Sequence, residues 1–242
     1  MGRYFDMHCH IIPEVDDGSD TLEESLAILD TEARAGVTDI ILTPHFRPEM
    51  FEADRDFVEE QYRFLEKAVA EVFPELHLYL GCEYHSNHGM HEMLRADPRY
   101  RMIGTNYVLL EFSQVHTGSY IREQTYSLIS RGFRPIIAHC ERYRPILSNI
   151  KLAEELVDMG AELQINADSV IGLDGWRIRR FCRKLMKLGL LSYIGSDAHN
   201  MMDRRCHMSE CIDYVERKMG RDYVNLIMWE NPKRIVDLSK KQ

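Results

Sequence analysis

The sequence lacks any hydrophobic run that could cross a membrane, and it lacks an excess of basic residues. No apolar stretch approaches the roughly 18 residues that a membrane-spanning helix needs, and polar and charged residues begin at Arg3, where a signal peptide would be apolar. Lysine and arginine total 30 against 39 acidic residues, a net charge of −9, whereas proteins that bind a phosphate backbone normally present a basic face. We therefore expect a cytoplasmic protein with no membrane insertion and no nucleic-acid partner.

Paired cysteine motifs are also missing. The six cysteines form no CxxC pair and no spacing typical of a secreted disulfide scaffold. Cys9, Cys82 and Cys140 each adjoin a candidate ligand, and on a strand such a neighbour faces the opposite side. We expect these thiols to be buried, where a free cysteine behaves as a small apolar residue.

Several catalytic signatures are absent as well. The chain has no P-loop and no GxSxG or GxGxxG context. Cys211 and Arg217 have the Cys-x₅-Arg spacing of cysteine-dependent tyrosine phosphatases, but the five residues between them include no glycine and are typical of a helix. The sequence therefore argues against a thiol nucleophile.

The dominant pattern in the chain is an alternation of strand and helix signals. The stretch Thr21-Leu22-Glu23-Glu24 is a capping box that opens a helix ending at Gly36. Strands are predicted at 4–5, 37–43, 76–80, 107–110, 135–138, 161–165 and 190–195, and the later helices at 54–73, 91–96, 119–130, 152–159, 176–188, 208–219 and 223–229, with a short final turn from Asn231-Pro232. Seven β-then-α units without a linker favour one α/β domain over residues 1–242, a distorted TIM-like (β/α)7 barrel.

Candidate metal ligands follow the predicted strands. His8 and His10 lie two residues apart, so on a strand they share one face. Acidic residues or histidines also end five other strands: His45, Glu83, Glu111, His139, Asp197 and His199. One such residue has an ordinary structural explanation, but the carboxyl ends of barrel strands converge on one face, so the joint pattern predicts a metal centre.

The composition of this set constrains the metal. Nitrogen and oxygen ligands without thiolate suit manganese, iron or zinc, and the carboxylates favour manganese or iron. Eight or nine ligands are too many for one ion. We therefore expect two or three divalent metal ions.

The motifs around these residues resemble the PHP (polymerase and histidinol phosphatase) superfamily. More narrowly, they resemble the CpsB/CapC/YwqE-type bacterial manganese-dependent tyrosine-protein phosphatases. The similarity runs from the first strand to Asn231-Pro232, and its matching stretches are 6–13, 16–19, 43–45, 110–112, 137–142 and 196–200. The resemblance implies a PHP fold with the metal site at the C-terminal ends of the strands.

The resemblance also implies how nine ligands are shared among three ions. The first ion is held by His8, His10 and Asp197, the second by Glu111 and His139, and the third by Asp16, His45 and His199. Glu83 bridges the first ion and the second. Asp16 is chosen over Asp17 because it lies six residues past His10, the superfamily spacing. Asp17 is then expected to shape the turn at Gly18.

The activity implied by the resemblance is hydrolysis of phosphotyrosine by in-line attack of a metal-activated water. Arg142 and Arg204 match the family's phosphate-binding arginines, with Arg205 as an alternative to Arg204. The implied partner is a phosphotyrosine-containing protein tail, that of a bacterial tyrosine autokinase regulating capsule or exopolysaccharide synthesis. A homo-oligomer is compatible with the sequence.

Three alternatives stay open on the sequence. A small-molecule PHP phosphomonoesterase, of the histidinol-phosphatase kind, would use nearly the same ligands. A nucleic-acid phosphoesterase is disfavoured by the acidic charge, and a non-catalytic metal-binding regulator would predict lost ligands, of which there are none. His85, His88 and His91 resemble a further cluster, but we interpret them as solvated or rim residues.

Overall fold

The structure is a computed structural model that describes residues 3–241, so residues 1, 2 and 242 of the expected domain lie outside the described part. Within it, the ladders between named strands are all parallel. The strands are β1 (Tyr4–Cys9), β2 (Val37–Leu42), β3 (His45–Phe46), β4 (His77–Leu80), β5 (Glu83–His85), β6 (Tyr107–Glu111), β7 (Arg134–Ile137), β8 (Glu162–Asn166) and β9 (Tyr193–Gly195). The α/β class and the strand-then-helix alternation predicted from the sequence are confirmed.

The strands form two sheets that follow one another around a common interior. One has the order β1-β2-β4 and the other the order β3-β5-β6-β7-β8-β9. Two residues separate β2 from β3 and β4 from β5, so the predicted strands at 37–43 and 76–80 are each followed by a second short segment. These short segments place His45 and Glu83 opposite each other in register.

The first and last strands also lie side by side. The backbone of His10 donates to the Ala198 carbonyl at 2.9 Å, and Asp197 donates to the His8 carbonyl at 2.8 Å. A Cβ on Gly195 would lie 2.6 Å from the Cβ of His8, a distance that side chains do not tolerate. Glycine is therefore needed for β9 to approach β1 at the point where the His8 side chain begins.

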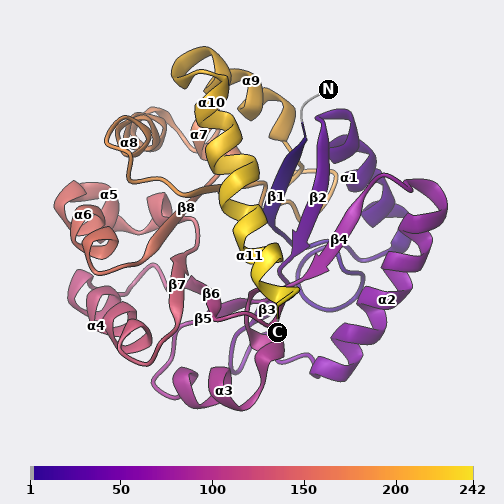
Figure 1. The fold of residues 1–242 in the computed structure, drawn as a ribbon, viewed down its shortest axis with the longest axis horizontal. Coiled ribbons are helices and arrows are strands. Elements are labelled where there is room, and N and C mark those ends of the chain that lie inside the picture. Colours follow the sequence, from indigo (N-terminus) through magenta and orange to yellow (C-terminus); the bar gives the residue numbers. More distant parts are fainter. Residues whose placement is uncertain (1–2, 242) are drawn as a thin grey trace.

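Helices surround the strands (Figure 1). They are α1 (Leu22–Arg34), α2 (Arg55–Val72), α3 (Met90–Ala96), α4 (Gly118–Ile129), α5 (Arg144–Ser148), α6 (Ile150–Asp158), α7 (Ala167–Ile171), α8 (Trp176–Lys187), α9 (Met208–Met219), α10 (Arg221–Asn225) and α11 (Asn231–Ser239), with short 3₁₀ turns that include η3 (Cys140–Arg142). One half of the predicted capping box is formed, because the Thr21 hydroxyl accepts a hydrogen bond from Glu24 N at 3.2 Å, while the Glu24 carboxylate accepts from Asp20 N at 3.3 Å instead of from Thr21 N. No helix within residues 3–241 combines the length and apolar character needed to span a bilayer.

The hydrophobic residues divide between two clusters. The larger one fills the space between the strands and the outer helices, and Cys9 lies in it, as predicted. The smaller one fills the interior enclosed by the strands, with Phe5, Met7 and Tyr193 among its members. Ile235 and Val236 of α11 close this interior cluster, and Figure 1 shows α11 crossing in front of the strands.

The predicted short final turn at Asn231-Pro232 is wrong. The chain continues there as α11, preceded without a break by the π-helical turn η4 (Leu226–Glu230). Proline lacks a backbone N–H, which stops a helix in its interior but costs little in a first turn. Burial of Ile235 and Val236 against the strands supplies the stabilisation that the local sequence pattern did not reveal.

Candidate metal centre

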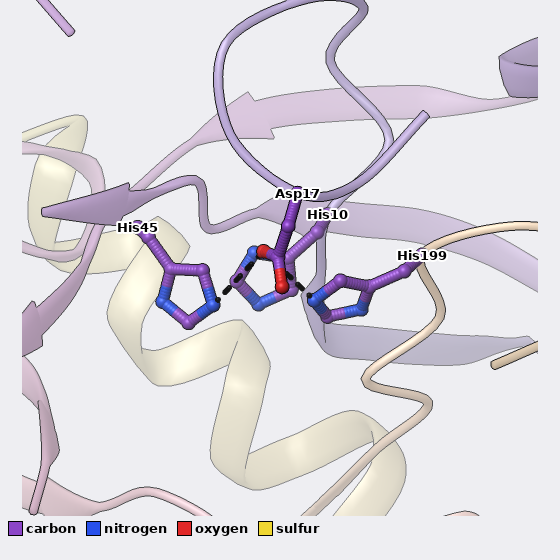
Figure 2. Close-up of side chains that lie close together, drawn as sticks. All are labelled: His10, Asp17, His45 and His199. Atoms are coloured by element: carbon purple, nitrogen blue, oxygen red, sulfur yellow. Dashed lines mark ion pairs between the residues drawn. The ribbon is translucent and has the colours of Figure 1, made fainter. Parts of the chain in front are cut away.

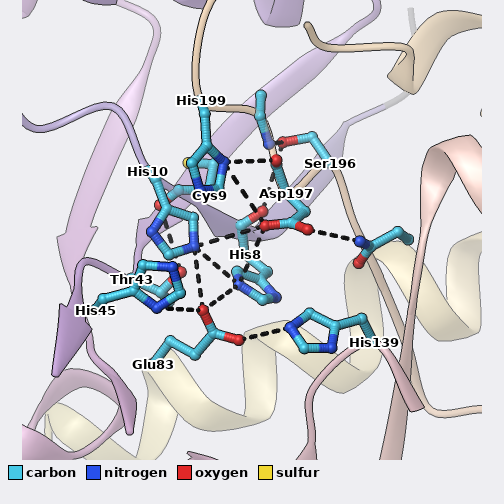
Figure 3. Close-up of polar contacts among 12 residues, drawn as sticks. His8, Cys9, His10, Thr43, His45, Glu83, His139, Ser196, Asp197 and His199 are labelled. Carbon is cyan, nitrogen blue, oxygen red and sulfur yellow. Dashed lines mark hydrogen bonds and ion pairs between the residues drawn. The ribbon is translucent and has the colours of Figure 1, made fainter. Parts of the chain in front are cut away.

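The predicted ligands converge at the C-terminal ends of the strands, and Figure 3 labels all of them except Asp16 and Glu111. His8 and His10 come from the end of β1, and their Nε2 atoms lie 3.1 Å apart. Asp197 follows β9, and its Oδ1 lies 3.7 Å from His8 Nε2 and 3.6 Å from His10 Nε2. Each of these three side chains offers one ligand atom, and the three atoms lie within 4.8 Å of one another, close enough to bind the same metal ion.

Four imidazoles are held in the same way, with Nδ1 against a protein partner and Nε2 turned toward the centre. The Nδ1 contacts are His8 with Gln164 Oε1 at 3.1 Å, His10 with Asp16 Oδ2 at 2.8 Å, His139 with the Tyr143 hydroxyl at 3.1 Å and His199 with the Asp197 carbonyl at 2.9 Å. Such partners fix the ring and the tautomer of metal-binding histidines. The arrangement leaves each Nε2 free to bind a cation.

Glu83 lies at the middle of the cluster. Its Oε2 is 3.2 Å from His8 Nε2, 3.3 Å from His10 Nε2 and 3.0 Å from His45 Nδ1, and its Oε1 is 2.9 Å from His139 Nε2. A group formed by His45, Glu83 and Glu111 provides a second possible metal position. A carboxylate placed between several imidazoles is suited to bridge two ions.

Asp17, and not Asp16, completes the third group with His10, His45 and His199 (Figure 2). Asp17 Oδ1 lies 3.4 Å from His45 Nε2 and 3.5 Å from His199 Nε2. The carboxylate of Asp16 instead contacts His10 Nδ1 and accepts hydrogen bonds from the backbone N–H groups of His45 at 2.9 Å and Gly18 at 3.0 Å. The geometry therefore favours Asp17 over Asp16 at the third position, the opposite of the expected placement, and the ligand role of either carboxylate stays a prediction.

The turn after Asp17 explains this reversal. A Cβ on Gly18 would lie 1.9 Å from the His10 carbonyl oxygen, so the chain folds closely back over β1. Ser19 N donates to that same carbonyl at 3.1 Å. The close return places Asp16 behind the imidazole of His10 and directs Asp17 toward the open side.

Two of the converging residues have a left-handed backbone. His139 has φ 30° and Asp197 has φ 53°, a conformation that costs non-glycine residues free energy. Each lies two residues past the last residue of its strand, and the unusual conformation turns the side chain inward at that point. Asn166, the polar residue that ends β8, supports this placement by donating from Nδ2 to Asp197 Oδ2 at 2.7 Å.

The carboxylates and imidazoles of the centre shift one another's pKa values. Burial alone would raise the pKa of Glu83, but the imidazoles of His8 and His45 outweigh it and hold that pKa well below its usual range. Burial likewise disfavours protonated histidine, yet the Glu83 carboxylate raises the pKa of His8 to about 9 and that of His45 to about 10. Burial and the neighbouring Glu83 raise the pKa of Glu111. Protonated imidazoles thus supply positive charge that the carboxylates require.

Unsatisfied polar atoms show that the residues present fit divalent cations. Buried polar atoms normally have hydrogen-bond partners. Within residues 3–241 the buried atoms that make no hydrogen bond of regular geometry include both oxygens of Glu83, Oε2 of Glu111, Nδ1 of His45 and Nε2 of His199, although the Glu83 oxygens lie within 3.3 Å of imidazole nitrogens. All five belong to this cluster, and all are nitrogen or oxygen donors of the kind that bind manganese, iron or zinc.

Arginines flank the cluster on its open side. Arg142 Nη1 donates to Asp197 Oδ2 at 2.8 Å, and Arg204 donates to Asp197 Oδ1 and to Asp17 Oδ2, both at 3.3 Å. Arg205 instead donates from Nε to His207 Nε2 at 3.0 Å. Of the two neighbours left open by the sequence, Arg204 is therefore the one that lies at the centre.

The sequence analysis missed Arg47. Burial, and after it the positive charge of Arg47, lower the pKa of His85 to about 4. The charge of Arg47 also acts to lower the pKa of Glu111. The side chain is half-buried and has no ion pair within the described part of the chain. Its position two residues past His45 was the only available signal. Arg47 is thus a third cation at the edge of the centre.

The histidines after Glu83 do not form a further metal group among the residues described. His88 is exposed, whereas His85 is buried, with Nε2 2.9 Å from the Ser113 hydroxyl, so of the two expectations for His85, solvated or rim residue, the first is wrong. The cysteines of the chain are all free and buried. Burial raises the pKa of the Cys82 thiol to about 11, which keeps it protonated at neutral pH and unsuited to act as a nucleophile.

Comparisons with known proteins agree with this geometry. A family model described as "Capsular polysaccharide synthesis, CpsB/CapC" matches residues 4–237. The tyrosine-protein phosphatase YwqE of Bacillus subtilis is 31% identical over 217 residues, which covers 90% of this chain and 85% of that protein. The tyrosine-protein phosphatase CpsB of Streptococcus pneumoniae is 31% identical over 242 residues, covering 96% and 97%.

A solved structure is similar throughout. It belongs to a study of YwqE from Bacillus subtilis and CpsB from Streptococcus pneumoniae, described as unique metal-dependent tyrosine phosphatases. The TM-score is 0.86 at 30% sequence identity, with 98% of this chain and 95% of that chain covered. The similarity therefore extends over nearly the whole chain.

Proposed function

Because this chain belongs to the CpsB/CapC family of capsular polysaccharide synthesis, we propose that it is a metal-dependent tyrosine-protein phosphatase. The observation that carries the proposal is the inward arrangement of imidazole nitrogens and carboxylates with unsatisfied buried atoms, bordered by two arginines that Asp197 holds. An activity of this kind requires a cation cluster next to a phosphate clamp, and both are formed by this chain's own residues.

The proposed ligands follow the three groups of neighbouring side chains, except that His139 is assigned to the second ion because it lies 2.9 Å from Glu83 and because the family resemblance implies it. They are His8, His10 and Asp197 for one ion, Glu83, Glu111 and His139 for a second, and Asp17, His45 and His199 for a third. His45 also reaches Glu83 from its Nδ1 side, so it is placed between the second and third positions. Manganese is the proposed native metal. Asp16 has the role of orienting His10.

The residues of the chain divide the chemical work. Bound divalent ions would supply Lewis-acid chemistry and lower the pKa of water to near neutrality. Arg142 and Arg204 each have N–H donors beyond those used on Asp197, and planar guanidinium groups bind phosphoryl oxygens well. Hydrogen bonds to Asp197 and Asp17 hold the two guanidinium groups in place. The arginines would therefore bind the phosphoryl group without first changing their conformation.

An aryl phosphate is the proposed substrate class because of the leaving group. Tyrosine phenol has a pKa of about 10, so phenolate leaves far more readily than a serine alkoxide. Hydrolysis of an aryl ester therefore needs no general acid. His85, a buried histidine in the loop after Glu83, is hydrogen-bonded to Ser113 and is not assigned this role.

The rim favours a polypeptide substrate over a small polar one. Loops that follow the ligand-bearing strands carry exposed large apolar side chains: Met50 at 58%, Val115 at 86% and Met202 at 81% of full exposure. Exposed apolar residues gathered around one site are typical of a surface that contacts another protein. We propose a phosphotyrosine-containing tail, that of a bacterial tyrosine autokinase in capsule synthesis, as the natural substrate.

Turnover tests this assignment directly. With metal supplied, the protein should hydrolyse a phosphotyrosine peptide at least about 100-fold faster, in kcat/KM, than a phosphoserine peptide of the same sequence or histidinol phosphate. Equal turnover of the two peptides would contradict the leaving-group argument. Preference for histidinol phosphate would identify a small-molecule phosphomonoesterase, and no turnover at full metal occupancy would identify a metal-binding regulator.

A pair of neighbouring substitutions tests the ligand assignment. Asp17→Asn should lose one ion per chain and about 100-fold in kcat/KM, because its oxygen lies between His45 and His199. Asp16→Asn should keep every ion when metal is saturating and should only weaken metal affinity, because that carboxylate supports His10 from behind. The number of metal ions bound per chain is measured for both variants. Loss of an ion in Asp16→Asn but not in Asp17→Asn would identify Asp16 as the ligand.

The broader setting is proposed on the same basis. Residues 1–242 form a single domain whose strands make a closed, distorted (β/α)7 barrel of the PHP type, with the hydrogen bonds between the ends of β1 and β9 as its closure. The protein acts in the cytoplasm, where an autokinase tail would be accessible. Assembly into a homo-oligomer is compatible with this arrangement, since the proposed centre uses side chains of one chain.

A further inference from the structure

Helix α8 concentrates positive charge in a chain whose net charge is −9. Between Trp176 and Lys187 it has six basic residues and no acidic one. All six are exposed and form no ion pair within residues 3–241, and only the guanidinium of Arg179 lies over an aromatic ring, that of Tyr214, 4.7 Å from its centroid. For comparison, Arg122 of α4 pairs with Glu155 of α6 at 2.7 Å. Unpaired cations on one helix create a local positive potential.

These cations line a groove. A cavity of about 400 Å³ lies between α8 and the junction of α5 with α6, which Figure 1 shows beside each other. Arg177, Arg180 and Lys184 form one wall, and Lys151 adds a cation from the other. Trp176, 71% exposed, stands at one end. The groove therefore combines four charges with an exposed aromatic ring.

The size of the groove suits a short extended peptide. From Trp176 to Lys184 is eight residues of helix, which at the α-helical rise is about 12 Å. An extended chain advances about 3.3 Å per residue, so about four residues would lie along the wall. Leu147 and Phe181 give the groove apolar surface between its charges. A concave site with this lining fits a peptide better than it fits a flat lipid surface.

The groove lies close, along the chain, to the phosphate-binding side of the centre. Arg142 ends η3, and Leu147 of the groove lies five residues further along the chain, in α5. Helix α8 packs against η3 on the other side. Both α6 and α8 begin after strands whose C-terminal ends carry the centre, and in βα units the following helix starts at that end. A bound peptide could thus pass from the arginine clamp into the groove.

We propose that this groove binds an acidic segment of the substrate polypeptide next to the phosphotyrosine. The proposal rests on the proposed phosphatase function and names a specificity element for it. Charge complementarity supports an acidic occupant, because the rest of this acidic protein repels such a segment and α8 attracts it. The exposed ring of Trp176 offers a surface for an apolar or aromatic residue within the segment.

The test compares two double variants of the full chain with metal bound. Arg180→Ala/Lys184→Ala removes two cations from the groove, and Arg217→Ala/Lys218→Ala removes two exposed cations from the last turn of α9 as the matched control. The substrates are a phosphotyrosine peptide with four flanking glutamates, the same peptide with four flanking glutamines, and p-nitrophenyl phosphate. Binding to vesicles containing phosphatidylserine is measured in parallel.

The expected results separate the groove from the centre. The groove variant should raise KM for the acidic peptide about 10-fold with kcat unchanged, and should leave the neutral peptide and p-nitrophenyl phosphate unaffected. The α9 variant should behave like the wild type. The wild-type preference for the acidic peptide should also decline as salt is raised, because exposed charges are screened.

Three outcomes would overturn the proposal. The groove has no such role if the wild type does not prefer the acidic peptide, or if both double variants raise its KM equally. If only vesicle binding is lost in the groove variant, the surface recognises anionic lipid. Failure of the phosphatase function itself would look different, because p-nitrophenyl phosphate and the neutral peptide would then not be hydrolysed by the wild type.

Discussion

Replacement of Glu83 by glutamine should reduce kcat/KM by at least about 1,000-fold, an order of magnitude beyond the effect of residues that only support metal ligands. The carboxylate is fully buried, and its two oxygens contact four imidazoles, those of His8, His10, His45 and His139. An amide is isosteric, but it is neutral and one of its two ends is a donor, so it cannot bridge two cations.

The mechanism of this loss gives it a specific signature. Glu83→Gln should lower the number of bound metal ions per chain and leave the far-ultraviolet circular dichroism spectrum unchanged. Glu92→Gln is the matched control, since Glu92 lies nearby in sequence, on α3, with its side chain 83% exposed. Kinetics and metal analysis of both variants check the prediction. Wild-type activity in Glu83→Gln would show that the cluster around this carboxylate is not the reacting centre.

The convergence of the site could be predicted from the sequence because it depends on a property of the fold. Parallel strands that alternate with helices bring their C-terminal ends to one face, so residues such as His45 and His139 are placed together by topology alone. The position of each strand end could be predicted because a short apolar stretch is followed there by a histidine or an acidic residue. The structure brings all of these strand-end residues into one cluster.

The choice between Asp16 and Asp17 could not be made in that way. Both residues lie in a loop, and adjacent loop residues exchange positions with a small change in backbone direction. The decisive feature is the close return of the chain at Gly18 over the His10 carbonyl, which is a tertiary contact. Spacing along the chain contains no information about such a contact.

The final helix and the groove were missed for a related reason. Pro232 indicated the end of a helix, but its position in the first turn of α11 is permitted, and packing of Ile235 inside the strands stabilises the element. The cations of α8 were visible in the sequence, whereas the opposite wall at Lys151 lies more than twenty residues away and is brought close only by folding. The local sequence pattern thus predicted the elements and the candidate ligands. It could not predict which residues come together in the folded chain, because tertiary contacts determine that.

Removal of divalent metal should abolish activity more completely than any substitution. Without cations, the buried carboxylates depend on protonated imidazoles for positive charge, as the raised pKa values of His8 and His45 indicate. That arrangement balances charge but offers no Lewis acid and no acidified water for attack on phosphorus. Metal binding should also stabilise the folded state, by about 2.7 kcal/mol at 100 times Kd, which for a chain of this length corresponds to a rise in Tm of about 5–10 °C.

The direct measurement is hydrolysis of a phosphotyrosine peptide by protein depleted of metal with a chelator and then supplied separately with Mn²⁺, Fe²⁺ or Zn²⁺. We expect no detectable turnover after depletion and recovery with Mn²⁺ in the wild type, together with the rise in Tm. His10→Ala should show no recovery with any of the three ions, because its Nε2 lies at the junction of two of the ligand groups. Full turnover by protein that metal analysis shows to be free of metal would contradict the proposed function.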